Sequence, residues 1–221
     1  KSHMSILEIG SGIGGPARYI ANKTGANVTA LELQPDQNKL ALDLTRRCGL
    51  SEKVIHVCGN FLNYNWLDQK FDVIVSWLTL YHILEHKILL KKCYDLLNTQ
   101  GFFYAEDLIS REPLNNDELL ELSKEIYAKT LSNYQDYKLC LKKAGYKLVS
   151  CKDMSEQWAK FTRDRALTYN KNKKKNLRVH GQEVVNSLCS FYSFIDRYFS
   201  TGKLGGIRII SCKSQTSQGL H

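Results

Sequence analysis

The chain of 221 residues is long enough for one α/β domain with its own core, and no apolar run is long enough to span a bilayer. Its seven cysteines are scattered without a C-x-x-C pair, which excludes a disulfide framework and a zinc site and predicts a cytoplasmic location. The lack of a membrane-spanning run predicts a soluble protein with no membrane partner. The formal charge of +9 belongs to the second half, because residues 1–110 hold 11 basic and 11 acidic side chains and residues 111–221 hold 20 and 11. This asymmetry predicts either a solvated basic face or an anionic partner.

The first half alternates β-branched runs with amphipathic helical patterns, which is typical of βαβ units and a parallel sheet. Lys1–Met4 are left out of this prediction, because they have the form of a cloning remnant or a truncation point. Helices are expected over Asp36–Cys48, which opens at Pro35 and stops at Gly49, and over His86–Leu97. The predicted strands, all expected to be buried on both faces, are Ser5–Ile9, Val28–Leu33, Val54–Cys58, Phe71–Ser76 and Gly101–Glu106.

The second half is less regular. Two more strands are predicted, Tyr146–Cys151 and Gly206–Cys212. The tract Asn170–Arg178 is so polar and charged that we expect an exposed, mobile loop, and we expect disorder from Ser214 onward. The helices predicted around these segments are Asn115–Thr130, Asn133–Ala144, Ser155–Tyr169 and Gln182–Phe199.

A glycine-rich turn, Gly10-Ser-Gly12-Ile-Gly14-Gly15, joins the first predicted strand to a helix. Side chains at such a turn would hold a ligand away from the backbone amides at the start of the helix. Glu32, 18 positions beyond Gly14, ends the next strand, where a carboxylate can bind both hydroxyls of a ribose. The alternative is a tight turn with a surface glutamate.

The sequence from Glu8 through Gly14 resembles the first motif, E/D-x-G-x-G-x-G, of the class I S-adenosylmethionine-dependent methyltransferases. The resemblance covers about residues 5–110 and implies a Rossmann-like seven-stranded sheet whose last strand, here "GIRIISC", is antiparallel. It implies S-adenosylmethionine as cofactor and S-adenosylhomocysteine as product. Asn60 departs from the family, which often has an acidic residue there to accept from the adenine amino group, but an amide oxygen can accept the same bond. The residues implied at the cofactor are Glu8, Gly10, Gly12, Gly14, Glu32, Leu33, Asn60, Phe61, Ser76 and Trp77.

Two stretches, Gly14–Tyr19 and "SWLTLYHI" from Ser76 to Ile83, resemble the branch that methylates small amines, including phosphoethanolamine, sarcosine and dimethylglycine methyltransferases. The resemblance places His82 beside the acceptor nitrogen, where an imidazole can hold or accept the amine proton. The alternative is a histidine packed under the following helix. His86 follows four residues later, but no third ligand is evident, so no metal is predicted.

The second half is rich in aromatic residues, which can surround a methylated cation but more often build a core. Tyr137, Arg178 and Arg197 are the candidates for a polar group of the acceptor, since an arginine fork suits a carboxylate or phosphate. Members of this branch have a helical segment before the first strand that closes over the cofactor. We therefore expect either that the chain is a fragment or that Ser155–Ser200 serves as the lid.

The sequence predicts one methyltransferase domain over 1–221, with a cofactor-binding half over 5–110 and a helical cap inserted over 152–203. The predicted function is N-methylation of a small amine or amino acid. Two alternatives stay open: methylation of a sterol, a tocopherol-like or another lipophilic acceptor, and a nucleic-acid- or protein-directed methyltransferase or cofactor-binding partner protein that uses the basic cap. The oligomeric state and the acceptor are not given by the sequence.

Overall fold

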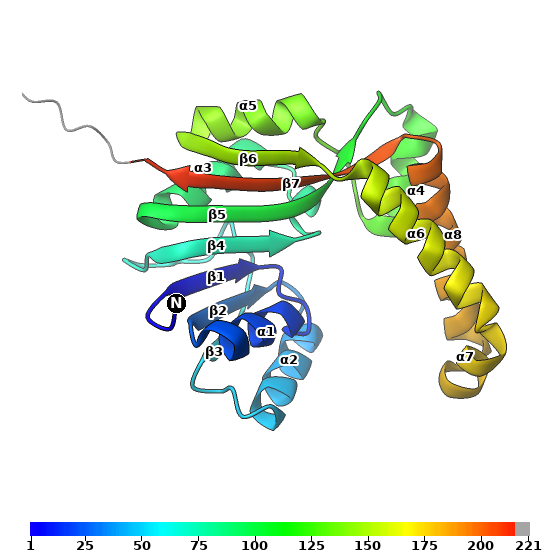
Figure 1. Cartoon of the computed structure of the whole chain (residues 1–221), viewed down its shortest axis with the longest axis horizontal. Helices are drawn as coiled ribbons and strands as arrows, with labels where there is room; N and C mark the ends of the chain where they lie inside the picture. The colour runs from blue at the N-terminus through cyan, green and yellow to red at the C-terminus, as the bar shows by residue number, and fades with distance from the viewer. Residues whose placement is uncertain (215–221) are drawn as a thin grey trace, which may run out of the picture. The chain divides into compact units, whose positions relative to one another are not determined.

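The computed structural model describes residues 1–214, which contain a seven-stranded sheet of order β3-β2-β1-β4-β5-β7-β6 (Figure 1). The strand β7 runs antiparallel to the others, as the resemblance implied. The tail predicted to be disordered lies, beyond Ser214, outside the described residues. The strands are β1 (Ser5–Ile9), β2 (Asn27–Glu32), β3 (Val54–Cys58), β4 (Phe71–Trp77), β5 (Leu97–Ser110), β6 (Tyr146–Asp153) and β7 (Leu204–Lys213).

The strand β1 lies at the centre of the parallel half, paired with β2 on one side and β4 on the other. Its residues Leu7 and Ile9 are fully buried, because neighbouring strands and covering helices exclude water from both of its faces. The prediction of burial on both faces is wrong at Phe102 of β5, which is 43% exposed, and for β3, where Ile55 is 63% exposed. The reason is position, since β3 is an edge strand that pairs only with β2.

The helices of the parallel half begin and end at the residues that the sequence pattern predicted, within a few positions. In α2, Pro35 and Asp36 occupy the first turn and Arg46 and Arg47 the last, which is the charge order that the helix dipole favours. The elements are α1 (Gly15–Thr24), α2 (Pro35–Arg47), the 3₁₀ turn η1 (Leu80–His82), α3 (His86–Leu96) and α5 (Tyr134–Ala144).

The chain divides into two compact units, and each is described by itself. The first comprises Lys1–Asp107, Tyr137–Cys151 and the last strand from Arg208 onward. The second comprises Leu108–Asp136 and Lys152–Ile207, so it contains the predicted cap together with a segment that precedes it. Its helices are α4 (Asn116–Ile126), α6 (Ser155–Lys171), α7 (Lys173–His180) and α8 (Gln182–Ser200).

The tract Asn170–Arg178 is helical, so the prediction of a mobile loop is wrong. The helix α6 continues to Lys171, and α7 starts immediately after the junction residue Asn172. Lysine and arginine have good helix propensity, Leu177 is half-buried, and α7 contacts both α6 and α8. Charge thus leaves one face of α7 in water without preventing the helix from forming.

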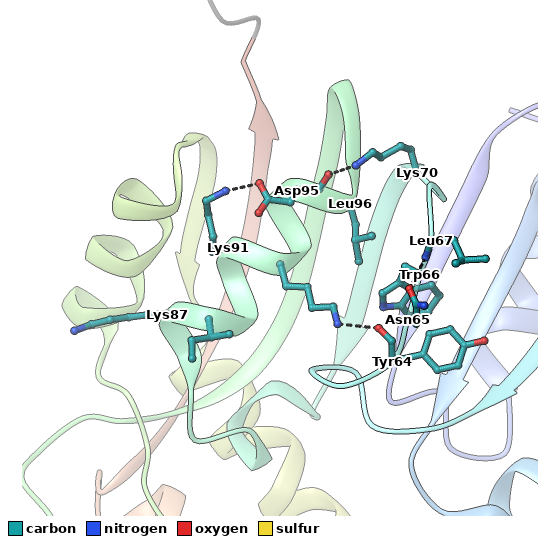
Figure 2. A pocket seen from close by; sticks show the side chains of 11 residues that line it. Tyr64, Asn65, Trp66, Leu67, Lys70, Lys87, Lys91, Asp95 and Leu96 are labelled. Carbon is teal, nitrogen blue, oxygen red and sulfur yellow. Dashed lines mark hydrogen bonds and ion pairs between the residues drawn. The ribbon is translucent and has the colours of Figure 1, made fainter.

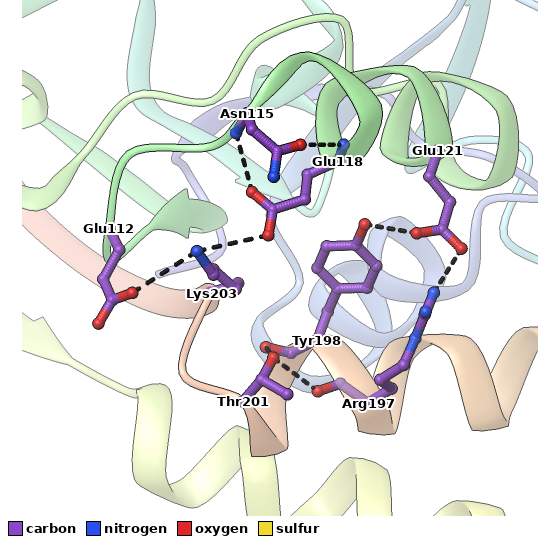
Figure 3. Close-up of polar contacts among 8 residues, drawn as sticks. All are labelled: Glu112, Asn115, Glu118, Glu121, Arg197, Tyr198, Thr201 and Lys203. Atoms are coloured by element: carbon purple, nitrogen blue, oxygen red, sulfur yellow. Dashed lines mark hydrogen bonds and ion pairs between the residues drawn. The ribbon is translucent and has the colours of Figure 1, made fainter.

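Polar contacts hold α4 to α8 and to the start of β7 in the second unit (Figure 3). Glu121 accepts a hydrogen bond of 2.6 Å from the Tyr198 hydroxyl and forms an ion pair with Arg197. The Lys203 ammonium lies 3.4 Å from the Glu118 carboxylate. Within residues 1–214 no helix is long and apolar enough to cross a membrane, and all seven cysteines are free thiols.

Candidate cofactor site and active site

The turn between β1 and α1 needs glycine at three positions. Gly10, Gly12 and Gly14 have φ angles of +71°, +53° and +75°, the left-handed region in which a side chain is strained. The amides of Gly10 and Ser11 both donate to the Leu31 carbonyl oxygen at 2.9 Å, which ties the turn to the end of β2. The glycine loop is therefore a fixed structure in the first unit.

Besides their φ angles, Gly10 and Gly12 have different surroundings, and the absence of a side chain has a different consequence at each. A Cβ at Gly10 would lie 2.1 Å from Cγ2 of Thr79, so the close approach of the chain after β4 requires glycine there. A Cβ at Gly12 would meet only the Gln37 side-chain oxygen, at 3.4 Å. Gly12 therefore leaves a space beside the loop, which suits close approach of a ligand to the backbone.

Glu32 is held against the loop by backbone amides. Its Oε2 accepts from the Gly12 amide at 2.7 Å, and its Oε1 accepts from the Gln34 amide at 2.9 Å. The side chain is only 7% exposed. The structure thus brings the carboxylate predicted for the ribose to the space beside Gly12.

Glu8 lies in β1 and is 1% exposed, and its Oε2 has no hydrogen-bond partner. Burial raises the pKa of Glu8 to about 8. This effect outweighs the hydrogen bond with the Ala17 backbone and the charge of Arg18, both of which lower the pKa. The buried Ser11 hydroxyl likewise has no partner. Buried polar groups are normally paired, so these two oxygens fit a site completed by a ligand with hydrogen-bond donors.

His56, which the sequence analysis did not select, packs under the loop from β3. Its Nε2 lies 2.8 Å from the Thr45 hydroxyl, and a Cβ at Gly14 would be 2.6 Å from its Cε1. Burial and the nearby Arg18 lower the pKa of His56. The only sequence signal was a histidine within the otherwise apolar run Val54–Cys58.

The remaining predicted cofactor residues differ in what they present to a ligand. Leu33 and Asn60 are exposed, although Asn60 Oδ1 already accepts from the Leu62 amide at 2.9 Å. Phe61 and Ser76 are buried, with Phe61 in an aromatic cluster and the Ser76 hydroxyl donating to the Ile9 carbonyl oxygen at 2.9 Å. The Trp77 ring packs on a neighbouring tyrosine ring, and the role of all these residues at a cofactor stays a prediction.

The two histidines after β4 have different environments. His82 ends η1 and is exposed, with its ring 3.9 Å from that of Tyr81. His86 is half-buried, its Nε2 lies 3.0 Å from the Leu80 carbonyl oxygen, and burial lowers its pKa. Of the two, His82 is the more exposed residue. Across residues 1–214 no group of side chains is arranged to hold a metal ion.

The three predicted acceptor residues are not gathered in one place within either unit. Tyr137 belongs to the first unit, is completely buried, and donates a hydrogen bond of 2.9 Å to Asp107 Oδ2. Burial and this carboxylate raise the pKa of Tyr137 well above its usual range. Arg178 and Arg197 belong to the second unit, where Arg178 is exposed on α7 and Arg197 pairs with Glu121.

A groove of about 630 Å³ lies between α3 and the connection from β3 to β4 (Figure 2). Four lysines line it, and three of them, Lys70, Lys91 and Lys92, already have partners. The Lys92 ammonium donates to two carbonyl oxygens at 2.7 and 2.9 Å, and Lys70 donates to the Asp95 carbonyl oxygen at 2.8 Å. None of the predicted cofactor or acceptor residues lines this groove, so it is separate from the glycine loop.

The strand order, the antiparallel β7 and the glycine loop after β1 define the class I methyltransferase fold. Residues 7–105, a little under half of the chain, match the family described as "Methyltransferase domain", and the cofactor of this fold is S-adenosylmethionine. The open space at Gly12 and the unpaired Glu8 oxygen fit that cofactor.

Among similar proteins, the phosphoethanolamine N-methyltransferase of Plasmodium falciparum is 28% identical over 186 residues, 83% of this chain and 68% of that protein. The glycine/sarcosine/dimethylglycine N-methyltransferase of Actinopolyspora halophila is 26% identical over 68% of this chain and 27% of its own length. A sterol 24-C-methyltransferase of Aspergillus fumigatus is 31% identical over 53% of this chain and 31% of its own length.

Among solved structures, the Haemonchus contortus phosphoethanolamine N-methyltransferase 2, in complex with phosphomonomethylethanolamine and S-adenosylhomocysteine, has a TM-score of 0.89 at 20% identity. The alignment covers 97% of this chain and 50% of that one. The chain also spans only 56% of another relative, a Streptomyces halstedii methyltransferase. It is thus markedly shorter than most of these proteins.

Proposed function

We propose that this chain transfers a methyl group from S-adenosylmethionine to the nitrogen of a small amine or amino acid. The observation that carries the proposal is the combination of an open space at Gly12, the Glu32 carboxylate beside it and the unpaired buried Glu8 oxygen. The relatives that methylate phosphoethanolamine and glycine support the choice of acceptor class.

The residues around the glycine loop would divide the cofactor between them. Glu32 would bind the ribose hydroxyls, Leu33 and Asn60 would lie along the adenine, and Glu8 would face the amino-acid end of the cofactor. When bound, S-adenosylmethionine supplies a methyl group on a sulfonium, which is open to in-line attack. The contribution of the protein is then chiefly to hold the acceptor nitrogen in line with that group.

His82 is the proposed catalytic residue. An amine attacks only through a free lone pair, and at neutral pH a small amine is largely protonated. An exposed imidazole, whose ordinary pKa is close to neutrality, can take up that proton and keep the nitrogen oriented. Tyr137, Arg178 and Arg197 remain candidates for the polar group of the acceptor, although Tyr137 would have to become accessible first.

A lipophilic acceptor is the second candidate, because a sterol C-methyltransferase matches this chain at 31% identity. A carbon acceptor has no ammonium proton to remove, so the two candidates differ in how much they need His82.

The free thiols support the predicted cytoplasmic location, which fractionation of cells would test.

The cofactor site is tested by isothermal titration with S-adenosylhomocysteine. Gly12→Val should abolish binding, because the side chain fills the space beside the loop while meeting little of the protein itself. Gly49→Val is the matched control, since Gly49 also has a positive φ, +67°, but lies in open space after α2. Equal affinity in wild type and Gly12→Val would refute the site.

The acceptor class is tested by screening amines and sterols with the same protein. His82→Ala should leave the affinity for S-adenosylhomocysteine within about twofold and lower kcat for an amine about 100-fold, the usual size of a general-base contribution. His180→Ala, which removes an exposed histidine of α7, is the control. Unchanged turnover in His82→Ala would show that this histidine is not catalytic.

A further inference from the structure

The segment from Arg165 to Gln182 carries positive charge without any acidic residue. It contains six basic side chains, five of them between Lys171 and Arg178. Figure 1 shows this segment as the end of α6 and the short helix α7, which joins α6 to α8. Much of the excess charge of the second half is thus concentrated on one short stretch of the second unit.

The helix α7 presents most of this charge outward. At about 100° per residue, Lys174, Lys175, Arg178 and Val179 share one side of the helix, and all four are exposed. Leu177 lies on the opposite side and is half-buried. The outer face of α7 therefore consists of three cations and one branched apolar side chain.

Nothing within the described part of the chain neutralises this face. The ion pairs of the second unit involve Arg163, Arg197 and Lys203, and none involves a residue of α7. Lys174 and Arg178 are four residues apart, a spacing at which like charges repel. Lys173, Lys174 and Lys175 also occupy the first turn of α7, where the helix dipole disfavours positive charge. An external anionic surface would relieve both repulsions.

Apolar side chains stand exposed within the same short stretch. Val179 is 68% exposed on the outer face of α7, and Leu167 is 63% exposed on α6, one turn before Lys171. Val184, in the first turn of α8, is exposed as well. A helix that lies on a lipid surface combines cations with apolar side chains that enter the acyl-chain boundary, and Val179 is the apolar side chain that α7 itself supplies.

We propose that the outer face of α7 binds an anionic phospholipid surface. The lysines and Arg178 would lie among the phosphate and carboxylate groups, and Val179 would enter the boundary of the acyl chains. This is peripheral binding, in which no helix crosses the bilayer. It departs from the sequence analysis, which predicted no membrane partner. The proposal does not involve the glycine loop, and it shares one residue with the proposed acceptor site, Arg178, so vesicle binding is measured without cofactor or methyl acceptor.

A nucleic acid is the competing polyanion, and the structure favours it less. An α7 of eight residues is only about 12 Å long, whereas a single nucleic-acid-binding module buries about 600–1,000 Å². The exposed valine and leucine have no role against a phosphate backbone. They are accounted for at a lipid interface.

The test is sedimentation of the full chain with vesicles of phosphatidylcholine containing 30% phosphatidylserine, with pure phosphatidylcholine for comparison. Binding should require phosphatidylserine and weaken with salt. The triple variant Lys174→Gln, Lys175→Gln and Arg178→Gln should bind about 100-fold more weakly, since each basic side chain near such a surface contributes about fivefold. Val179→Ser should weaken binding further without changing the net charge.

The matched control removes three lysines from the first unit, Lys142→Gln, Lys143→Gln and Lys147→Gln, and all three are exposed. If the two triple variants lose binding equally, only net charge matters and the proposal is wrong. Equal binding to both kinds of vesicle would overturn it too. So would tight binding of a duplex oligonucleotide, without binding to vesicles, that the α7 variant alone removes. An α7 triple Lys/Arg exchange, Lys174→Arg, Lys175→Arg and Arg178→Lys, should keep vesicle binding.

Discussion

Glu8 should make the ligand-free protein less stable as the pH rises, which is the opposite of what an ordinary surface carboxylate does. Its pKa is about 8 in the folded protein, against an ordinary value of 4.5 that applies once the chain unfolds. Between these two values the folded protein binds one proton more than the unfolded chain. The contribution of Glu8 to the free energy of unfolding therefore falls with rising pH between pH 4.5 and 8. Below pH 4.5 this contribution does not change with pH.

The magnitude follows from the linkage relation. One extra proton in the folded state lowers the free energy of unfolding by about 1.4 kcal/mol per pH unit. From pH 5.5 to pH 7.5 the loss due to Glu8 is about 2.5 kcal/mol, slightly less than the full slope because Glu8 begins to ionise near pH 7.5, and a large share of the 5–15 kcal/mol typical of a domain. With an m-value of about 2.5 kcal/mol per M, the urea midpoint should fall by about 1 M.

The assay is urea unfolding of wild type and Glu8→Gln at a series of pH values, followed by tryptophan fluorescence. Glutamine mimics the protonated acid, so the variant should be the more stable protein, and its advantage should widen as the pH rises. Subtracting the two curves cancels the histidines, which titrate in the same range. Parallel curves for wild type and variant would refute the argument, because Glu8 would then ionise with its ordinary pKa in the folded state.

Two further predictions concern the glycine loop. Gly10→Ala should destabilise the protein by about 3 kcal/mol, because a left-handed alanine is strained and its Cβ would overlap Thr79; Gly49→Ala, with the same strain in open space, should cost only about 1–2 kcal/mol. Similar unfolding midpoints for these two variants would show that Thr79 moves aside without cost. His56 has a lowered pKa, so the unfolded chain binds more protons below pH 6.5 and stability should fall on acidification. His56→Gln should flatten that decline in urea unfolding between pH 6.5 and 5, and an unchanged decline would count against a buried neutral imidazole.

The fold of the first half could be predicted because its signals are local. Apolar runs gave the strands, and glycines with a positive φ gave the turn after β1. The exposure of β3 could not be predicted in this way, because Val54–Cys58 is nearly as apolar as the central strands and differs from them in how many neighbours it pairs with. Register and order are long-range properties.

The tract Asn170–Arg178 shows a different limit. Its charge correctly indicated exposure, but exposure was taken to mean absence of structure. Helix propensity and the half-buried Leu177 are sufficient for α7, because one inward residue per turn can anchor a short helix whose other faces are solvated. Composition alone does not separate a charged loop from a charged helix.

The candidate site divides in the same way between local and distant signals. Glu8, Gly12 and Glu32 were found because the motif and its spacing place them along two adjacent strands. His56 was missed because its contact with Gly14 joins residues 42 positions apart and depends on the register of β3 against β2. Residues that contact a loop only through the tertiary structure have no characteristic spacing from it in the sequence.

The two glutamates at the loop have different tasks, and their hydrogen bonds explain why. Glu32 accepts hydrogen bonds from the backbone amides of Gly12 and Gln34, so it stabilises the loop in the ligand-free protein. Glu8 leaves one buried oxygen unpaired, an arrangement that disfavours the ionised folded state until a donor reaches it. If a ligand ammonium is that donor, binding must release the proton that Glu8 holds, and the affinity should rise with pH up to about 8. A buried carboxyl that weakens the ligand-free fold would in this way favour the bound one.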